Sequence, residues 1–188
     1  MKAGVLALQG AFREHREVLD ALGVEAIEVR TPEELGALDA LILPGGESTT
    51  MSKLLDTAGV RAPLAERLAD GFPVLGTCAG MILLASDVVD GRPDQEWFGA
   101  IDVSVRRNAY GRQRDSFETP LDMSGLAVDG LPGGPFPGVF IRAPRIESVG
   151  ERVEVLARHE GVPVLARQDA VVVASFHPGL SDRQSTLL

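Results

Sequence analysis

Short apolar runs alternate with amphipathic segments along the first half of the chain. Three runs have the composition of buried strands, at residues 5–8, 40–43 and 74–75, and residues 24–29 alternate as a further strand. The segments that follow them have helical spacing or helix-starting residues, and they predict helices at residues 11–22, 31–35, 50–57, 61–69 and 81–85. Strands that alternate with helices are typical of a parallel sheet covered on both faces, so the pattern predicts an α/β fold.

The second half of the chain has shorter apolar runs and more turn residues. Three segments read as loops, at residues 88–99, 108–114 and 131–138. Strand patterns occur at residues 100–106, 139–142, 153–157, 162–167 and 170–176. We expect the last three to extend the sheet as antiparallel strands. Because the sequence has no repeat or long linker, we predict a single domain over residues 1–188.

Polar and glycine residues follow three of the predicted parallel strands. Gln9-Gly10 follows the first strand, Gly45-Gly46 the third, and Cys78 the fourth. Binding sites of open α/β sheets form at the carboxyl ends of the strands. The three segments are therefore expected to meet at one edge of the sheet and to form a site there.

The only cysteine lies in a segment with the pattern of a nucleophile elbow. Residues 76–80 read G-T-C-A-G, between an apolar strand and an apolar helix. Glycines flank the cysteine because such a turn is too crowded for larger side chains. The free N–H groups at the start of the helix would hold an oxyanion and lower the pKa of the Cys78 thiol. A buried cysteine that fills space in the core has the same short pattern, so both interpretations stay open.

Three histidines could serve this thiol as a base. His15 lies among charged residues of a predicted helix and is expected to be solvated, and His159 lies in a turn-like segment. His177 instead follows an apolar run at residues 171–176 and precedes Pro178, which places it at the end of a buried strand. If that strand lies beside the one that leads to Cys78, His177 can accept the thiol proton.

The glycine pair at residues 45–46 and two arginines are further candidates. The pair lacks the G-x-x-x-x-G-K-[ST] pattern of a phosphate loop, and Glu47 would repel a phosphate. It fits either an oxyanion loop, in which the Gly46 N–H points at a substrate carbonyl, or a simple turn. Arg107 and Arg142 each follow a strand pattern and could bind a substrate carboxylate or lie on the surface.

Composition and charge exclude several function classes. The net charge of −9 argues against a broad nucleic-acid surface. No apolar run reaches the roughly 18 residues of a membrane span, so we expect no membrane partner. A single cysteine excludes an internal disulfide and suits a reducing compartment, which predicts a cytoplasmic protein. No cluster of side chains has metal-ligand spacing, and we expect neither a metal nor another cofactor.

Seven segments carry a resemblance to a known family. In chain order they are residues 8–10, 43–51, 76–80, 107–108, 117–118, 139–144 and 175–178. Together they resemble the glutaminase subunits of pyridoxal 5'-phosphate synthase, which are class I, triad-type glutamine amidotransferases. The G-x-C-x-G and H-P pieces are shared across class I enzymes, whereas P-G-G-E-S-T-T and F-I-R-A-P are specific to this subfamily. The resemblance spans nearly the whole chain.

The resemblance implies a flavodoxin-like α/β fold and hydrolysis of L-glutamine to glutamate and ammonia through a cysteine thioester. The ammonia would pass to a separate synthase subunit of a hetero-oligomer that makes pyridoxal 5'-phosphate (vitamin B6). Cys78 would be the nucleophile and His177 its base, and the backbone N–H groups of Gly46 and Ala79 would form the oxyanion hole. The residues implied for glutamine binding are Gly46, Glu47, Ser48, Arg107, Ile141 and Arg142.

The C-terminal end departs from the family pattern. The family has His-Pro-Glu, in which the glutamate orients the histidine, but this chain has Gly179 at the third position. We expect a loss of rate, made smaller by a thiolate–imidazolium pair, and Asp182 is a candidate replacement. The tail after Ser181 also differs from the closing helix of the family, which an altered C-terminal end of the gene would explain.

The sequence leaves three functions open. The chain is a glutaminase stimulated by its synthase partner, or a binding-only subunit of the same complex that Gly179 has impaired. The third is the glutaminase subunit of another amidotransferase, such as one for imidazole glycerol phosphate formation. The subfamily-specific segments weigh against the third.

Overall fold

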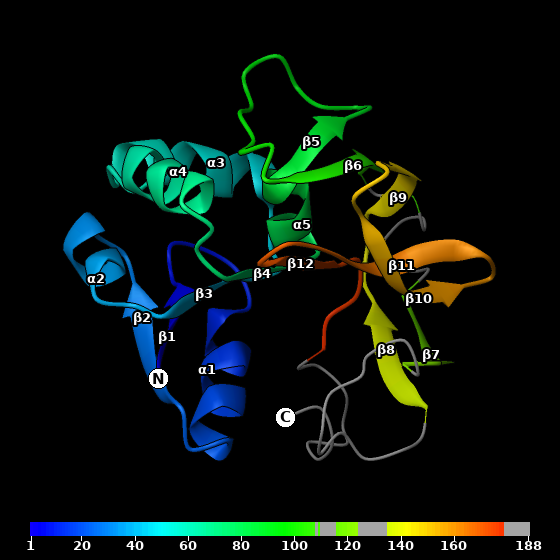
Figure 1. Cartoon of the computed structure of the whole chain (residues 1–188), viewed down its shortest axis with the longest axis horizontal. Coiled ribbons are helices and arrows are strands. Elements are labelled where there is room, and N and C mark those ends of the chain that lie inside the picture. The colour runs from blue at the N-terminus through cyan, green and yellow to red at the C-terminus, as the bar shows by residue number, and fades with distance from the viewer. Residues whose placement is uncertain (108, 110–115, 124–134, 179–188) are drawn as a thin grey trace.

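A seven-stranded sheet forms the centre of the molecule, in the order β10-β11-β12-β4-β3-β1-β2 (Figure 1). The computed structural model describes residues 1–107, 109, 116–123 and 135–178. The seven strands are β1 (Lys2–Leu6), β2 (Glu25–Val29), β3 (Ala40–Leu43), β4 (Val74–Thr77), β10 (Glu154–His159), β11 (Val162–Gln168) and β12 (Val171–Ala174). The five strands from β2 to β12 run parallel, and β11 and β10 continue the sheet as antiparallel strands. The parallel part has the flavodoxin-like order, which confirms the predicted fold class.

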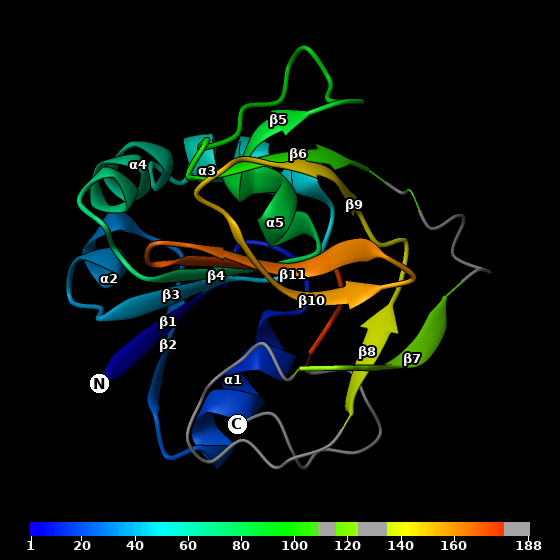
Figure 2. The same ribbon diagram turned by 45° about the vertical axis from the view of Figure 1, so that its right-hand side comes forward.

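Helices cover both faces of the parallel strands. α1 (Phe12–Ala21) lies on one face, and α3 (Ser48–Thr57), α4 (Arg61–Ala69) and α5 (Ala79–Leu84) lie on the other (Figures 1 and 2). The short α2 (Pro32–Gly36) contacts β2. Its start follows the sequence prediction, since Thr31 is the N-cap of a capping box and Pro32 is at the first helical position.

Alternate side chains of the strands fill two apolar layers. In β1, Ala3 and Val5 pack with Leu19 of α1, whereas Leu6 belongs to the larger cluster that includes Met51 of α3. Successive side chains of a strand point to opposite faces, and both faces here are covered by helices. This double burial explains why the interior strands β3 and β12 read as continuous apolar runs, whereas the edge strand β2 includes two glutamates.

Two smaller sheets flank the central one. The first has the order β5-β6-β9, from β5 (Ala85–Val88), β6 (Ile101–Arg106) and β9 (Arg145–Val149). The second is the hairpin of β7 (Phe117–Leu121) and β8 (Phe136–Phe140). An aromatic cluster that includes Phe136, Phe140 and Phe176 packs this hairpin against the C-terminal strands. A bridge between Val139 and His177 continues the contact.

The second half of the chain departs from the sequence prediction. β5, β7 and β9 were not predicted, and β8 lies mostly in the segment predicted as a loop and ends at Phe140 rather than at residue 142. Prolines and a glycine obscured the hairpin, because Pro120 pairs with Pro137 beside Gly138. A two-stranded hairpin tolerates proline because it leaves some backbone N–H groups unpaired.

Several sequence predictions fall on residues outside the described ranges. These are Gly179, Asp182, the C-terminal tail and most of the basic loop at residues 108–114. Within the described ranges, no helix is both long enough and apolar enough to cross a membrane.

Candidate active site

The turn between β4 and α5 presents Cys78 at the carboxyl end of the sheet. β4 ends at Thr77, α5 begins at Ala79, and Cys78 between them has φ 50° and ψ −103°. A non-glycine residue with positive φ is strained and persists only where its surroundings hold it. Part of that support is the neighbouring strand, because the Cys78 N–H donates to the Ala174 carbonyl of β12 at 2.8 Å. The turn therefore has the sharp shape that the G-x-C-x-G pattern predicts.

The two glycines of this motif are explained by close packing. A β-carbon at Gly76 would lie 2.6 Å from the side chain of Leu84, and one at Gly80 would lie 2.8 Å from the carbonyl carbon of Leu43. Separations this short are well inside van der Waals contact, and the second involves backbone that cannot turn away. Only glycine fits at these two positions without moving the sheet or the helix.

The thiol of Cys78 is buried, and burial decides its charge. Desolvation raises the pKa of Cys78 to about 11. The backbone N–H groups of Ala79 and Gly46, as hydrogen-bond donors to the sulfur, and the charge of Arg142 act in the opposite direction. The sequence prediction of a lowered thiol pKa is therefore wrong, because the N–H groups are present but the loss of solvent outweighs them.

His177 lies beside Cys78 because their two strands are neighbours. β12 pairs in parallel with β4, with Ala174 opposite Thr77. A β-carbon at Gly45 would lie 2.7 Å from Nδ1 of His177 and 3.4 Å from Cβ of Cys78, so both side chains border the same glycine. The strand adjacency that the sequence left conditional is thus present in the fold.

The His177 ring is also buried, and this decides its charge at neutral pH. Burial lowers the pKa of His177, and the nearby carboxylate of Glu14 only partly opposes that shift. A neutral imidazole then faces a neutral thiol. The sequence analysis expected a resting thiolate–imidazolium pair to reduce the loss of rate that follows from the missing glutamate. That expectation is not met, because a buried site disfavours both charges.

The glycine loop after β3 lies against the segment after β1. The Glu47 N–H donates to Oε1 of Gln9 at 2.9 Å, and the Ala11 N–H donates to the Gly45 carbonyl at 2.9 Å. A β-carbon at Gly46 would lie 2.5 Å from Oε1 of Gln9. The carboxyl ends of β1, β3 and β4 therefore meet at one edge of the sheet, as the positions of these segments in the sequence indicate.

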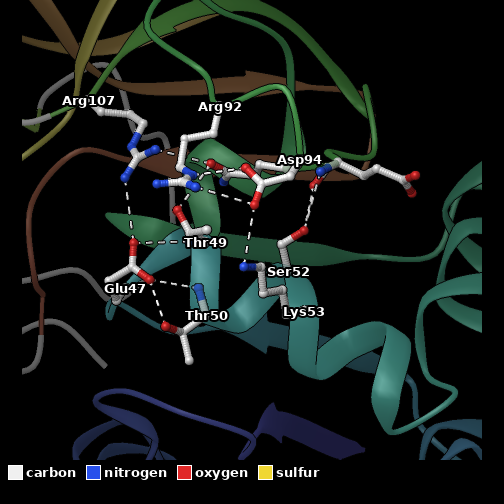
Figure 3. A network of polar contacts seen from close by, with 10 residues as sticks. Glu47, Thr49, Thr50, Ser52, Lys53, Arg92, Asp94 and Arg107 are labelled. Atoms are coloured by element: carbon white, nitrogen blue, oxygen red, sulfur yellow. Dashed lines mark hydrogen bonds and ion pairs between the residues drawn. The ribbon is translucent and has the colours of Figure 1, made fainter.

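Glu47 has two partners that the sequence did not predict. Its carboxylate caps helix α3 by accepting hydrogen bonds from the Thr49 N–H at 3.1 Å and the Thr50 N–H at 2.6 Å. Arg107 approaches the same carboxylate at 3.5 Å (Figure 3). Partial burial raises the pKa of Glu47, but the hydrogen bonds from Thr50 and Thr49 outweigh it and lower the pKa overall. The neighbouring Ser48 is buried within the first turn of the helix.

Arg107 is held in place by residues on three sides. The backbone N–H of Arg107 donates to the carboxylate of Asp90 at 2.8 Å, and Nη1 of its guanidinium donates to Oε1 of Gln95 at 3.2 Å. Oε1 of Gln95 also accepts from the hydroxyl of Thr49, at 3.4 Å. We call Glu47, Thr49, Gln95 and Arg107 the polar network, and Figure 3 labels Glu47, Thr49 and Arg107.

Ile141 and Arg142 directly follow β8. Arg142 is exposed and has φ 45°, whereas Ile141 is half-buried. The positive charge of Arg142 acts to lower the pKa of Cys78, against the larger effect of burial. The contacts above bring Cys78 and His177 to the glycine loop, and the glycine loop to Gln9. In the described ranges, no group of three or more histidine, cysteine or carboxylate side chains could hold a metal ion.

Comparison with known proteins identifies the family. Residues 5–187 match the family model of the SNO glutamine amidotransferase family. The chain belongs to this family.

Relatives and a solved structure agree with the family. One relative, "Pyridoxal 5'-phosphate synthase subunit PdxT" of Mycobacteroides abscessus, is 57% identical over 175 residues, which cover 93% of this chain and 88% of the relative. The subunit PdxT of Rhodococcus jostii is 54% identical over 182 residues, with the same two coverages of 93% and 88%. A crystal structure of a glutamine amidotransferase is 51% identical, with a TM-score of 0.86 over 97% of this chain and 93% of that one.

Sequence reasoning missed two residues next to the site of this SNO-family amidotransferase. Gln95 lies in a segment read as a loop, and no local pattern marks its contact with Arg107. His15 was expected to be solvated but is buried, with Nε2 3.1 Å from the hydroxyl of Thr77. The charged neighbours of His15 hid its position on the buried face of α1. The turn-like His159 instead ends β10 and packs on Phe140.

Proposed function

We propose that this chain hydrolyses L-glutamine to glutamate and ammonia through a thioester on Cys78. The observation that carries the proposal is the meeting of Cys78, His177 and the glycine loop, where both side chains border Gly45. The N–H groups of Gly46 and Ala79 act on the same sulfur, which puts two donors next to the reacting atom. Membership of a glutamine amidotransferase family supports the choice of substrate.

The reaction begins from neutral partners. As Sγ of Cys78 attacks the carboxamide carbon of glutamine, the thiol proton passes to His177. The carbonyl oxygen becomes an oxyanion between the N–H groups of Gly46 and Ala79. The imidazolium then gives its proton to the departing nitrogen, ammonia leaves, and a thioester remains. Water attacks the thioester with His177 as base, which releases glutamate and restores the thiol.

The remaining site residues hold the amino-acid end of glutamine. Arg142 or Arg107 binds the α-carboxylate, and Glu47 binds the α-ammonium, since each matches the substrate in charge. The observed ion pair between Glu47 and Arg107 supports this, because it keeps both charges beside the glycine loop. Gly46, Ser48 and Ile141 complete the glutamine site in this proposal.

The ammonia goes to a synthase subunit that makes pyridoxal 5'-phosphate, and the two chains form a hetero-oligomer. This part of the proposal comes from the relatives named as synthase subunits, which match more than nine-tenths of this chain. The proposal takes residues 1–188 as a single domain and includes no nucleic-acid or membrane partner. A cytoplasmic location suits the free, buried thiol of Cys78.

Ammonia release from L-glutamine tests the proposal, measured for the purified chain with and without the synthase subunit. We expect turnover that increases in the complex, and none for Cys78→Ser. The variant Gly179→Glu separates the binding-only alternative, which predicts a silent wild type and an active variant. If wild type and Gly179→Glu are both silent in the complex while glutamine still binds, the proposed roles of Cys78 and His177 are wrong. Activity only with a different synthase would support the third alternative.

A further inference from the structure

His15 is a buried histidine that the proposed mechanism does not use. It is 5% exposed, although its neighbours in α1 include the exposed Arg16 and Glu17. Nε2 of the ring lies 3.1 Å from Oγ1 of Thr77, whose exposed fraction is 0%. A buried polar pair is costly unless its members bond to each other, so this contact is a specific feature of the fold. It joins residues 62 positions apart in the sequence.

The partner of His15 is the residue directly before the nucleophile. Thr77 is the last residue of β4, and the strained Cys78 follows it with φ 50°. The backbone of Thr77 pairs with Ala174 of β12, and its side-chain hydroxyl contacts His15 of α1. A strained residue keeps its conformation only when the contacts around it determine that conformation. The hydrogen bond from α1 is one of those contacts.

We propose that His15 is a positioning residue for Cys78. The hydrogen bond between His15 and Thr77 fixes the turn between β4 and α5. The turn sets the direction of the sulfur toward His177 and toward the N–H groups of Gly46 and Ala79. The effect of His15 on turnover rests on the proposed glutaminase function. The effect of His15 on the position of the Cys78 sulfur is independent of that function.

The charge state of His15 agrees with this role. Burial, and the charge of His177 when protonated, lower the pKa of His15 to about 4. The ring is therefore neutral at physiological pH and does not oppose the imidazolium that forms on His177. Either neutral tautomer satisfies the contact, because the hydroxyl of Thr77 can donate or accept.

A double-mutant cycle tests the hydrogen bond. We expect His15→Leu and Thr77→Val each to lower kcat for ammonia release about 10-fold with little change in KM, because each leaves a buried polar group without its partner. The double variant should lose about as much as one single variant, rather than the product of both losses. His15→Gln should stay within about 3-fold of the wild type, since its amide reaches the position of Nε2.

Alkylation of Cys78 by iodoacetamide is the second readout, and it reports on one site because the chain has one cysteine. We expect His15→Leu and Thr77→Val to change the alkylation rate severalfold, and His15→Gln to leave it unchanged. Leu19→Ala is the matched control, because Leu19 is a buried residue of α1 in a different contact. It should lower the melting temperature and leave the kcat and the alkylation rate near wild type.

Any one of three results overturns the proposal. The first is a wild-type kcat and alkylation rate in folded His15→Leu, and the second is additive losses of kcat in the double-mutant cycle. The third is a loss of kcat in Leu19→Ala as large as the loss in His15→Leu. Thr77→Val decides the question by itself if His15→Leu does not fold. If the wild type releases no ammonia, the glutaminase proposal fails while the alkylation series still tests the positioning role.

Discussion

The two sides of the candidate site differ in how they treat charge. Cys78 and His177 are both buried. Burial raises the pKa of Cys78 and lowers the pKa of His177, and both shifts favour the neutral side chain. Hydrogen bonds from Thr50 and Thr49 instead lower the pKa of the exposed Glu47, and its carboxylate forms an ion pair with Arg107. The difference follows from desolvation, since an ion without water needs several good partners to remain charged.

This contrast assigns different tasks to the two sides. A neutral thiol and imidazole exchange a proton only as the substrate carbon is attacked, so the buried side determines the rate of the chemical step. The polar network presents fixed charges before any reaction takes place, which is suited to binding the charged end of an amino acid. Substitutions on the buried side should therefore change kcat, and those in the polar network should change KM.

The largest expected effect is on the buried side, at the sulfur. Cys78→Ala removes the nucleophile and should lower kcat for ammonia release by at least about 1,000-fold. Calorimetric binding of glutamine should persist, because the variant leaves the polar network intact. Loss of binding together with turnover would break the comparison, since it would give Cys78 a part in substrate affinity.

The next effect concerns the glycine that both buried side chains border. A β-carbon at Gly45 would lie 2.7 Å from Nδ1 of His177, so Gly45→Ala must displace the ring. We expect a loss of about 100-fold in kcat, similar to the removal of one oxyanion donor. Gly36→Ala is the control, because a β-carbon there has nothing within 4 Å. Equal kcat values for the two variants would contradict the packing argument.

A smaller effect is expected in the polar network. Arg107→Gln removes the cation next to Glu47 and should raise KM for glutamine about 10-fold, with kcat within about 2-fold of wild type. Arg92→Gln is the matched control, since Arg92 pairs with Asp94 at 2.9 Å at the exposed rim of the same region (Figure 3). A fall in kcat without a change in KM would reverse the assignment of tasks to the two sides.

The smallest effect is a pH dependence of stability. The pKa of His15 is about 4 in the folded chain, below the ordinary value of 6.5, so the unfolded chain takes up the proton first as the pH falls. The stability due to neutral His15 is present above pH 6.5 and is lost as the pH falls toward 4. Between pH 6.5 and 5.5 the wild type should lose about 1 kcal/mol more free energy of unfolding than His15→Gln. Urea titrations at the two pH values measure this difference, and parallel losses would contradict it.

Local patterns were sufficient where one property of the chain dominates. The run at residues 40–43 became β3 with the predicted bounds, because a doubly covered parallel strand must be apolar throughout. The glycines around Cys78 predicted a sharp turn, and steric contacts with Leu84 and Leu43 explain them. Local patterns failed for β7 and β8, where cross-strand pairing and the aromatic contacts of Phe117 and Phe140 outweigh the turn tendency of proline and glycine.

The sequence alone determined the α/β class, the elbow, and the segments that meet at the carboxyl ends of the strands. These features depend on local sterics and on chain direction, which act within a few residues. Only the tertiary structure decided that the pKa of the Cys78 thiol is raised, that His177 is neutral, and that His15 is buried against Thr77. Burial and long-range hydrogen bonds set these properties, and both depend on residues far apart in the chain.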